Sequence, residues 1–186
     1  NPHYFQWRGR PTILITSGEH YGAVMNLDFD YRKYVDTLAA DGLKVIGIDV
    51  KPHRRGIVCD ITDPQAVARA VRSIGRVDVL VNNAGILSNN KSQATTPEEW
   101  RRVLAANVDG AFYLSRAVIP GMKKRRWGRI VNTCSLAAKT GGLTAGTAYS
   151  TSKGALTSLT FSLARELASF GVTVNGISPA YVRTPM

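Results

Sequence analysis

The chain has 186 residues, which suits one domain with a sizeable core and leaves too little for two. Hydrophobic residues make up 44% and charged residues 20%, so we expect a globular fold, and no apolar run is long enough to predict a membrane span. The net charge of +11 favours an anionic partner. However, the one dense basic run, Lys123 to Arg126, ends a predicted helix, where cations are favoured, and no nucleic-acid-binding motif accompanies it. We therefore expect a solvated helix end and no nucleic-acid or membrane partner.

The two cysteines, Cys59 and Cys134, each lie in or at the end of a predicted strand. We interpret them as small buried residues in a reduced compartment rather than as a disulfide. The N-terminus has no apolar signal core. We therefore expect a cytoplasmic protein, and we expect no metal site.

Short apolar runs mark the predicted strands. An N-terminal strand, turn and helix are expected within residues 1–42, with that helix beginning near Asp28 or Asp30. From about residue 43 onward, strands are predicted at 44–49, 77–81, 129–134 and 172–177. Helical patterns separate these strands, so the sheet is expected to be parallel.

Capping residues mark the predicted helices. Asp63 and Pro64 form the cap and first position of one helix. A capping box beginning at Thr96 opens a long helix that runs to about Arg126, with Pro120 as a candidate bend. A third helix is predicted at 149–170, with leucines on one stripe. The pattern predicts a single α/β domain, residues 1–186, with a doubly wound parallel sheet, helices on both faces and ligands beyond the carboxyl ends of the strands.

Four polar residues fall where such a fold binds ligands. Tyr149 and Lys153 lie four positions apart on one helix and therefore on one face. An ammonium beside a phenol favours the phenolate, so Tyr149 can exchange a proton near neutral pH. Ser135 ends the preceding strand, where its hydroxyl can bond a substrate oxygen. Asn107 lies on the apolar stripe of the long helix, where a buried amide needs partners; it can bend the helix and hold a water that links Lys153 to solvent.

The sequence resembles the short-chain dehydrogenases/reductases from about Gly42 to Met186. The matching segments are Asp-Ile-Thr-Asp at 60–63, Val-Asn-Asn-Ala-Gly at 81–85, Tyr-Ser-Thr-Ser-Lys at 149–153 and Asn-Gly-Ile-Ser-Pro at 175–179, together with Asn107 and Ser135. The resemblance implies a Rossmann-like fold, an NAD(P)-dependent oxidoreductase acting on an alcohol or carbonyl, and Asn107, Ser135, Tyr149 and Lys153 as its catalytic tetrad.

The resemblance also implies which residues hold the cofactor. Lys153 would bond the nicotinamide ribose, beside Tyr149. Asp60 and Ile61 would flank the adenine, and Asn83, Ala84 and Gly85 would close that side, with small residues allowing backbone approach. Pro179 and Thr184 would approach the nicotinamide. Asp49 ends a predicted strand, where a carboxylate accepts bonds from a ribose 2′-hydroxyl and repels a 2′-phosphate, so we expect NAD rather than NADP.

The phosphate-binding turn departs from the family pattern. Gly18 and Gly22 keep the register of its glycines, but Val24 replaces the third, and the stretch from Gly18 to Asp49 is longer than in the family. Residues 1–42 also weakly resemble the start of a glycoside-hydrolase-like barrel. The chain ends at Met186, so we expect it to lack the family's C-terminal lid and last strand.

Two further readings follow from these departures. In the main alternative, the chain is a truncated or chimeric short-chain dehydrogenase-like fold without catalysis, acting at most as a binding or oligomerisation module. A carbohydrate hydrolase would need a second carboxylate near Glu19 and a longer barrel.

The helices at 100–126 and 149–170 resemble those of the family's subunit interface, so a homodimer or homotetramer is expected, with a small alcohol or carbonyl compound as substrate.

Overall fold

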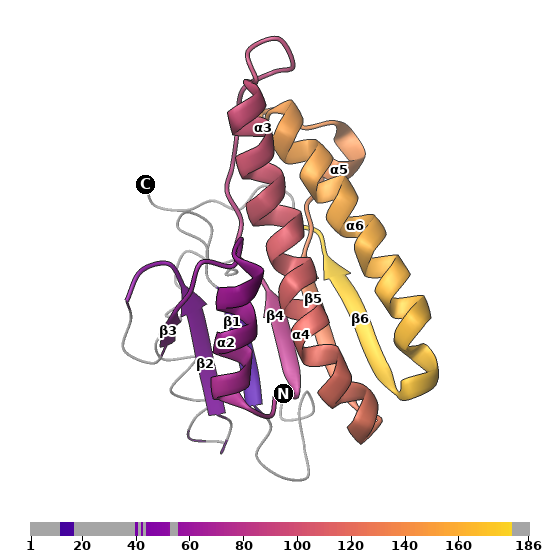
Figure 1. Cartoon of the computed structure of the whole chain (residues 1–186). Coiled ribbons are helices and arrows are strands. Elements are labelled where there is room, and N and C mark those ends of the chain that lie inside the picture. Colours follow the sequence, from indigo (N-terminus) through magenta and orange to yellow (C-terminus); the bar gives the residue numbers. More distant parts are fainter. Residues whose placement is uncertain (1–11, 17–39, 41, 43, 53–55, 180–186) are drawn as a thin grey trace.

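Six parallel strands form the sheet that carries the described part of the molecule (Figure 1). The computed structural model describes residues 12–16, 40, 42, 44–52 and 56–179. The strand order is β3-β2-β1-β4-β5-β6, in which neighbouring strands all pair in parallel. Their bounds are β1 Thr12–Thr16, β2 Lys44–Asp49, β3 Gly56–Val58, β4 Val79–Asn82, β5 Gly128–Thr133 and β6 Val172–Ile177. The Rossmann-like α/β arrangement predicted from the sequence is therefore confirmed.

The helices α2, α4 and α6 cover one face of this sheet (Figure 1). The bounds are α2 Pro64–Ile74, α3 Pro97–Leu104, α4 Gly110–Arg125, α5 Ala137–Thr140 and α6 Thr147–Leu167, with a π-helical turn at Ala105–Asp109 and a 3₁₀ turn at Ala168–Phe170. The helix predicted near Asp28 or Asp30, which would serve the other face, lies outside the described residues. No helix in the described ranges is both long and apolar enough to cross a membrane.

Local capping explains where the helices begin and end. Asp63 Oδ1 accepts a hydrogen bond from Gln65 N at 2.8 Å, and Thr96 Oγ1 accepts one from Glu99 N at 3.1 Å, so both predicted caps are confirmed. After α6 the chain turns at Gly171, whose φ is +69°. A Cβ there would lie 2.4 Å from the Arg126 carbonyl oxygen, so only glycine fits this turn.

Some element bounds differ from the prediction. The strand expected at 77–81 is Val79–Asn82, and the helix expected from 149 begins at Thr147. The strand β3 and the helix α5 are too short for periodicity to reveal their bounds. Cys59 and Cys134 follow β3 and β5 and are free and buried, as predicted.

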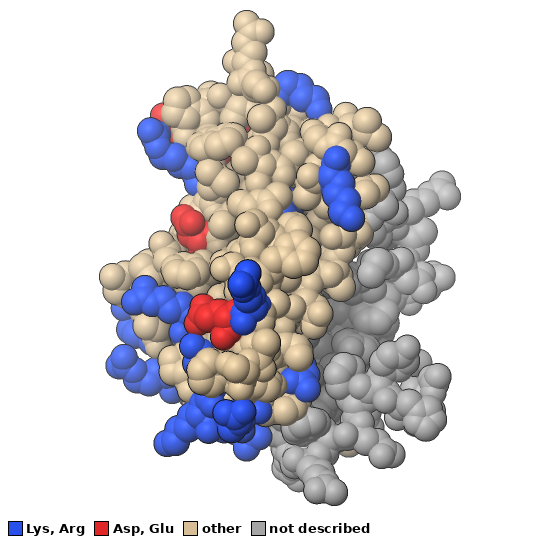
Figure 2. Space-filling model, turned by 90° about the vertical axis from the view of Figure 1, so that its right-hand side faces the viewer, with Lys and Arg blue, Asp and Glu red and all other residues tan. Residues whose placement is uncertain are grey.

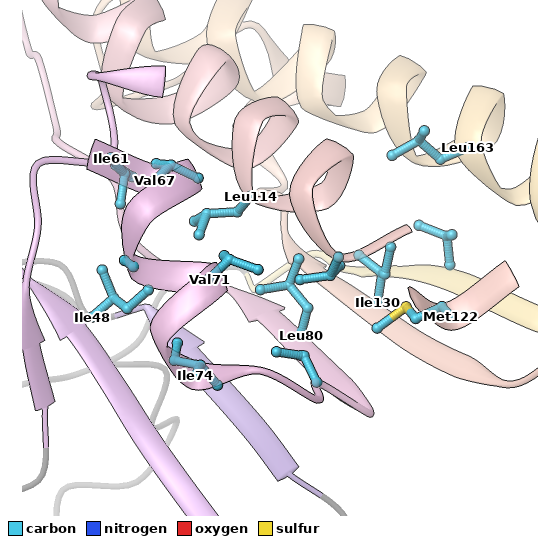
Figure 3. Packing of buried hydrophobic residues seen from close by; sticks show 14 of the residues in the cluster. Ile48, Ile61, Val67, Val71, Ile74, Leu80, Leu114, Met122, Ile130 and Leu163 are labelled. Atoms are coloured by element: carbon cyan, nitrogen blue, oxygen red, sulfur yellow. The ribbon is translucent and has the colours of Figure 1, made fainter. Parts of the chain in front are cut away.

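The core joins the strands to the three helices on this face (Figure 3). Leu80 and Ile130 on the central strands, Leu114 and Met122 on α4, and Leu167 on α6 are fully buried. Burying each such side chain stabilises the fold by roughly 1.5–3 kcal/mol. This packing fixes α6 over β5 and β6, and so fixes the residues that α6 carries toward the carboxyl edge of the sheet.

The basic run at the end of α4 is more engaged than predicted. Lysine and arginine side chains gather at the end of the molecule where α4 finishes (Figure 2). Lys123 pairs with Glu166 at 3.0 Å and lies over the Phe170 ring. Arg125 Nη2 donates to the Val77 carbonyl at 2.6 Å. Lys124 and Arg126 are exposed, as expected of a solvated helix end, whereas Lys123 and Arg125 fasten this end of α4 to α6 and to the segment before β4.

Candidate active site

The predicted site residues gather where β4 and β5 end. These two strands are neighbours, and Asn82 pairs in register with Asn132. The connection after β4 begins with Asn83, and the one after β5 reaches Ser135. Helix α6 then starts at Thr147 and carries both Tyr149 and Lys153. The parallel topology thus brings residues from distant parts of the chain to one edge, as parallel sheets do for their ligand sites.

Lys153 is the most buried charge of this group. Its side chain lies on α6, and the residue is only 4% exposed. Nζ donates to the Thr133 carbonyl oxygen at 2.7 Å and lies 5.6 Å from the centre of the Tyr149 ring. Burial disfavours the charged form and lowers the pKa of Lys153 from 10.5 to about 8, against a smaller opposing effect of Cys134. The amine therefore still carries its proton at pH 7.

Gly85 lies close to that ammonium. A Cβ built at this position would lie 3.4 Å from Lys153 Nζ and 3.1 Å from Asn107 Oδ1. The first distance is an ordinary contact, whereas the second is tight, so a larger residue would press on Asn107. The small residue that sequence reasoning expected for backbone approach therefore lies directly beside two members of the predicted tetrad.

Asn107 lies in the π-helical turn Ala105–Asp109 and is 1% exposed. Its Oδ1 accepts from Ile86 N at 2.7 Å, and its Nδ2 donates to Ile86 O at 3.0 Å and to Ser152 Oγ at 2.9 Å. Such π turns frequently mark functional positions in long helices. The amide thus ties the connection after β4 to helix α6, and the water relay to Lys153 stays a prediction.

Ser135 and Tyr149 are both half-buried at this edge. Ser135 Oγ accepts a hydrogen bond from Ala137 N at 3.1 Å, which orients the hydroxyl at the start of α5. A serine hydroxyl also has a proton to donate and a second lone pair. Ser135 therefore keeps the capacity to bond a substrate oxygen.

Asp49 and Asp60 end or follow strands on the β2–β3 side of the sheet. Asp49 Oδ1 accepts from Lys51 N at 2.9 Å. Asp60 Oδ1 accepts from Thr62 N at 2.9 Å and from the Thr62 hydroxyl at 2.8 Å. Each carboxylate has a second oxygen with further acceptor capacity. Both residues lie at the edge where the resemblance expects the adenosine part of a dinucleotide.

The other predicted cofactor residues differ in how accessible they are. The Ile61 side chain is buried against Gly110, and a Cβ on Gly110 would come within 2.5 Å of it. The backbone of Ile61 is therefore the part that a cofactor could contact. Asn83 is also buried, and its Oδ1 accepts from Thr133 Oγ1 at 3.1 Å. Ala84 packs against the core, and the Pro179 carbonyl accepts from Leu136 N at 3.0 Å. The predicted residues Gly18, Gly22 and Thr184 lie outside the described part of the chain.

Sequence reasoning missed several contacts around the site. It did not find that the Thr133 carbonyl accepts a hydrogen bond from Lys153, because a backbone acceptor has no sequence signature. It assigned Glu99 to the capping box alone, whereas the Glu99 carboxylate also accepts from Ser88 and Asn90. It gave Lys91 no role, although Nζ of Lys91 bonds two carbonyls more than 50 positions along the chain. Within the described residues, no group of His, Cys, Asp and Glu could hold a metal ion.

Comparison with known proteins shows which family this chain resembles. A family model for short chain dehydrogenases matches residues 32–186. The chain is 36% identical over 172 residues to the 3-oxoacyl-[acyl-carrier-protein] reductase FabG of Escherichia coli (strain K12), covering 83% of this chain and 70% of that protein. It is 40% identical over 170 residues to the short-chain reductase protein NovJ of Streptomyces niveus, covering 81% of this chain and 64% of that protein. Residues 1–31 lie outside the family match, and the barrel-like resemblance of residues 1–42 stays a prediction.

Solved structures agree with this placement. An NAD⁺-bound xylitol dehydrogenase superposes with a TM-score of 0.74 at 31% identity, covering 93% of this chain and 71% of that chain. An oxidoreductase of the short-chain dehydrogenase/reductase family from Brucella ovis, in complex with a partially ordered NAD, gives a TM-score of 0.76 at 27% identity, covering 91% and 83%. The chain therefore belongs to the short-chain dehydrogenases, a family of oxidoreductases that use NAD or NADP to act on alcohol and carbonyl groups.

Proposed function

We propose that this chain moves a hydride between NAD and an alcohol or carbonyl substrate, with Tyr149 as the acid and base. The observation that carries the proposal is the placement of Lys153. Its buried ammonium lies beside the Tyr149 ring, is held by the Thr133 carbonyl, and lies close to Gly85. A buried cation next to a phenol favours the phenolate, which a neutral-pH proton acceptor requires.

The reaction then follows from what each side chain can do. In the oxidation direction Tyr149 takes the hydroxyl proton of the alcohol, while the hydride on the same carbon leaves. The nicotinamide supplies the acceptor for that hydride. In the reduction direction Tyr149 returns the proton to the carbonyl oxygen. Ser135 donates a hydrogen bond from its hydroxyl to the substrate oxygen, where negative charge develops, keeps its own proton, and so lowers the barrier in both directions.

Asn107 supports the reaction without touching the substrate. It holds both backbone groups of Ile86, next to Gly85, and also bonds Ser152, the neighbour of Lys153. Asn107 therefore ties the backbone next to Gly85 to the turn of α6 that carries Lys153. The water that would link Lys153 to solvent belongs to this proposal.

The proposed cofactor contacts run along the carboxyl edge. Lys153 bonds the nicotinamide ribose, and Asn83, Ala84 and Gly85 line the path toward Asp60 and the Ile61 backbone. Asp49 accepts from a ribose 2′-hydroxyl at the end of β2, which favours NAD over NADP. The remaining proposed contacts are those of Gly18, Gly22, Pro179 and Thr184.

Turnover of the Tyr149→Phe variant tests the proposal. With NADH and a panel of carbonyl compounds, or NAD and a panel of alcohols, we expect the wild-type chain to turn over and Tyr149→Phe to lose about a hundredfold or more in kcat. Cofactor affinity should stay within about twofold, since the phenol hydroxyl acts on the substrate. Tyr113→Phe, on α4 outside the site, is the matched control and should keep wild-type turnover.

Two outcomes would count against this assignment. Undiminished turnover by Tyr149→Phe would remove Tyr149 from the chemistry. Saturable cofactor binding by the wild-type chain without turnover of any compound would favour the non-catalytic binding module instead.

A further inference from the structure

We propose that Lys91 and Glu99 are positioning residues that set the start of helix α6 and, with it, the place of Tyr149. They act through residues 86–92, which we call the strap. This inference rests on the proposed role of Tyr149. Neither residue touches the predicted tetrad, and neither belongs to the motifs by which the sequence resembles its family.

The strap supplies the hydrogen bonds that begin α6. The Ser88 carbonyl accepts from Gly146 N at 2.6 Å, and the Asn90 carbonyl accepts from Thr147 N at 3.1 Å. The cap residue of α6, Gly146, has no side chain with which to bond the first turn. A Cβ on Gly146 would lie 2.4 Å from the Asn90 carbonyl oxygen, so the two backbones meet as closely as they can. The first turn of α6 therefore depends on where the strap lies.

Lys91 fastens the strap to the turn that leads into α6. Its Nζ donates to the Gly142 carbonyl at 3.0 Å and to the Ala145 carbonyl at 2.7 Å. Gly142 has a φ of +77°, which favours glycine, and a Cβ there would lie 2.9 Å from the Ala145 carbonyl oxygen, so this turn is tightly packed. The ammonium of Lys91 thus bonds two carbonyls on opposite sides of the turn and holds it against the strap.

Glu99 fastens the strap to helix α3. One carboxylate oxygen accepts from Ser88 Oγ at 2.5 Å and the other from Asn90 Nδ2 at 2.8 Å. These two bonds, the Ser88 bond first, hold the pKa of Glu99 below its ordinary value, so the carboxylate stays charged at neutral pH. Ser88 and Asn90 are the residues whose carbonyls receive the first N–H groups of α6. Glu99 therefore acts on the start of α6 indirectly, by holding the two strap residues that bond it.

The far end of the strap is held by the active site itself. Asn107 bonds both backbone groups of Ile86. Tyr149 follows Thr147 by two positions, so a tilt of the first turn of α6 moves the phenol directly. Lys153, one turn further on, keeps its own anchor on the Thr133 carbonyl. Loosening the strap is therefore expected to displace Tyr149 while leaving the cofactor side in place, and a displacement of about 1 Å can cost about a hundredfold in rate.

The test compares Lys91→Met and Glu99→Gln with Lys139→Met and Glu98→Gln. The two control residues lie on α5 and α3. Lys139 is exposed, and among the described residues Glu98 makes only a long ion pair, with Arg101 at 3.8 Å. We expect the two strap variants to lose about ten- to a hundredfold in kcat, with NADH affinity within about twofold of wild type, and the controls to lose neither. Lys91→Arg should restore most of the rate, because a guanidinium can still bond the two carbonyls.

Hydrogen exchange gives a second measurement that does not depend on turnover. In both strap variants, the amides of residues 146–149 should exchange about tenfold faster than in wild type, while amides in the centre of α6 stay protected. Unchanged exchange at 146–149, or a fall in NADH affinity parallel to the fall in kcat, would overturn the proposal. If the wild-type chain shows no turnover at all, the role of Tyr149 fails, whereas the exchange result still decides whether the strap sets the start of α6.

Discussion

The ammonium of Lys153 is almost completely buried. The residue is 4% exposed, and burial lowers its pKa to about 8. In the unfolded chain a lysine keeps its proton to a pH of about 10.4. Between these two values the unfolded state binds more protons than the folded state, so the contribution of Lys153 to stability rises with pH across this window. Below pH 8 Lys153 is protonated in both states, and the full free-energy cost of burying its ammonium opposes folding.

Replacement of Lys153 by methionine makes this contribution measurable. We expect the unfolding free energy of wild type, relative to Lys153→Met, to increase by about 2 kcal/mol between pH 7 and pH 10. Urea denaturation of both proteins without cofactor, at each pH, provides the comparison. If the difference between the two proteins is the same at both pH values, Lys153 has an ordinary pKa and the burial argument is wrong.

The sequence identifies individual site residues better than it identifies their partners. The side-chain types of Tyr149 and Lys153 and their spacing already indicate proton exchange by a phenol beside an ammonium. Their partners are backbone carbonyls, such as that of Thr133, or residues brought close only by the fold, such as Ser152 beside Asn107. Backbone acceptors leave no pattern in the sequence, so the strap contacts of Lys91 could not be predicted. Those of Glu99 are with Ser88 and Asn90, side chains that only the fold brings close to it.

At the scale of elements, the start of α6 is determined by how closely two backbones approach. Gly146 meets the Asn90 backbone at distances no side chain allows, whereas Gly154, in the middle of the same helix, has no neighbour within 4 Å of an added Cβ. Gly146 caps the helix and Gly154 lies within it, yet only Gly146 has a packing reason to be glycine.

Alanine substitutions at these two positions should therefore have opposite effects. Gly146→Ala forces the strap away and is expected to destabilise the fold by about 1–3 kcal/mol. Gly154→Ala is expected to stabilise it by about 0.5–1 kcal/mol, because alanine is the better helix former and the site has room. Thermal or chemical denaturation measures both. A neutral Gly146→Ala variant would show that the close approach of strap and helix is absent in solution.

Elements were predictable where their signal is local. The cap at Asp63 and the capping box at Thr96 mark helix starts, and apolar runs mark β2 and β6 to the residue. The π-helical turn was not foreseen, because the apolar stripe from Leu104 to Val118 fits an unbroken α-helix. The turn carries Asn107, whose contact with Ile86 spans 21 positions and is not encoded by helical periodicity.

At the scale of the whole molecule, α4 and α6 present exposed aromatic side chains. Phe112 on α4 is 42% exposed and Phe161 on α6 is 73% exposed, and the two helices run side by side on one face of the sheet (Figure 1). The resemblance to family subunit interfaces predicts that these helices pair across a twofold axis. Large exposed apolar side chains on such a face fit that expectation.

A charged residue at this face should disrupt the predicted assembly. We expect Phe161→Asp to shift a dimer or tetramer toward a smaller species in sedimentation or light scattering, because a carboxylate there would lose its hydration on pairing. Val58→Asp, an equally apolar and 59% exposed position on β3, is the control and should keep the wild-type mass. The same mass for wild type and Phe161→Asp would remove α6 from the interface.

The proposed activity requires a dinucleotide to bind at the carboxyl edge of the sheet, beside Lys153. Titration of the full chain with NADH, followed by nicotinamide fluorescence, tests this without any knowledge of the substrate. We expect saturable binding below millimolar concentration, weakened about tenfold or more in Lys153→Met, where the charged donor to the ribose is lost. No saturation of the wild-type chain up to millimolar NADH, or equal binding by Lys153→Met, would show that no dinucleotide binds beside Lys153.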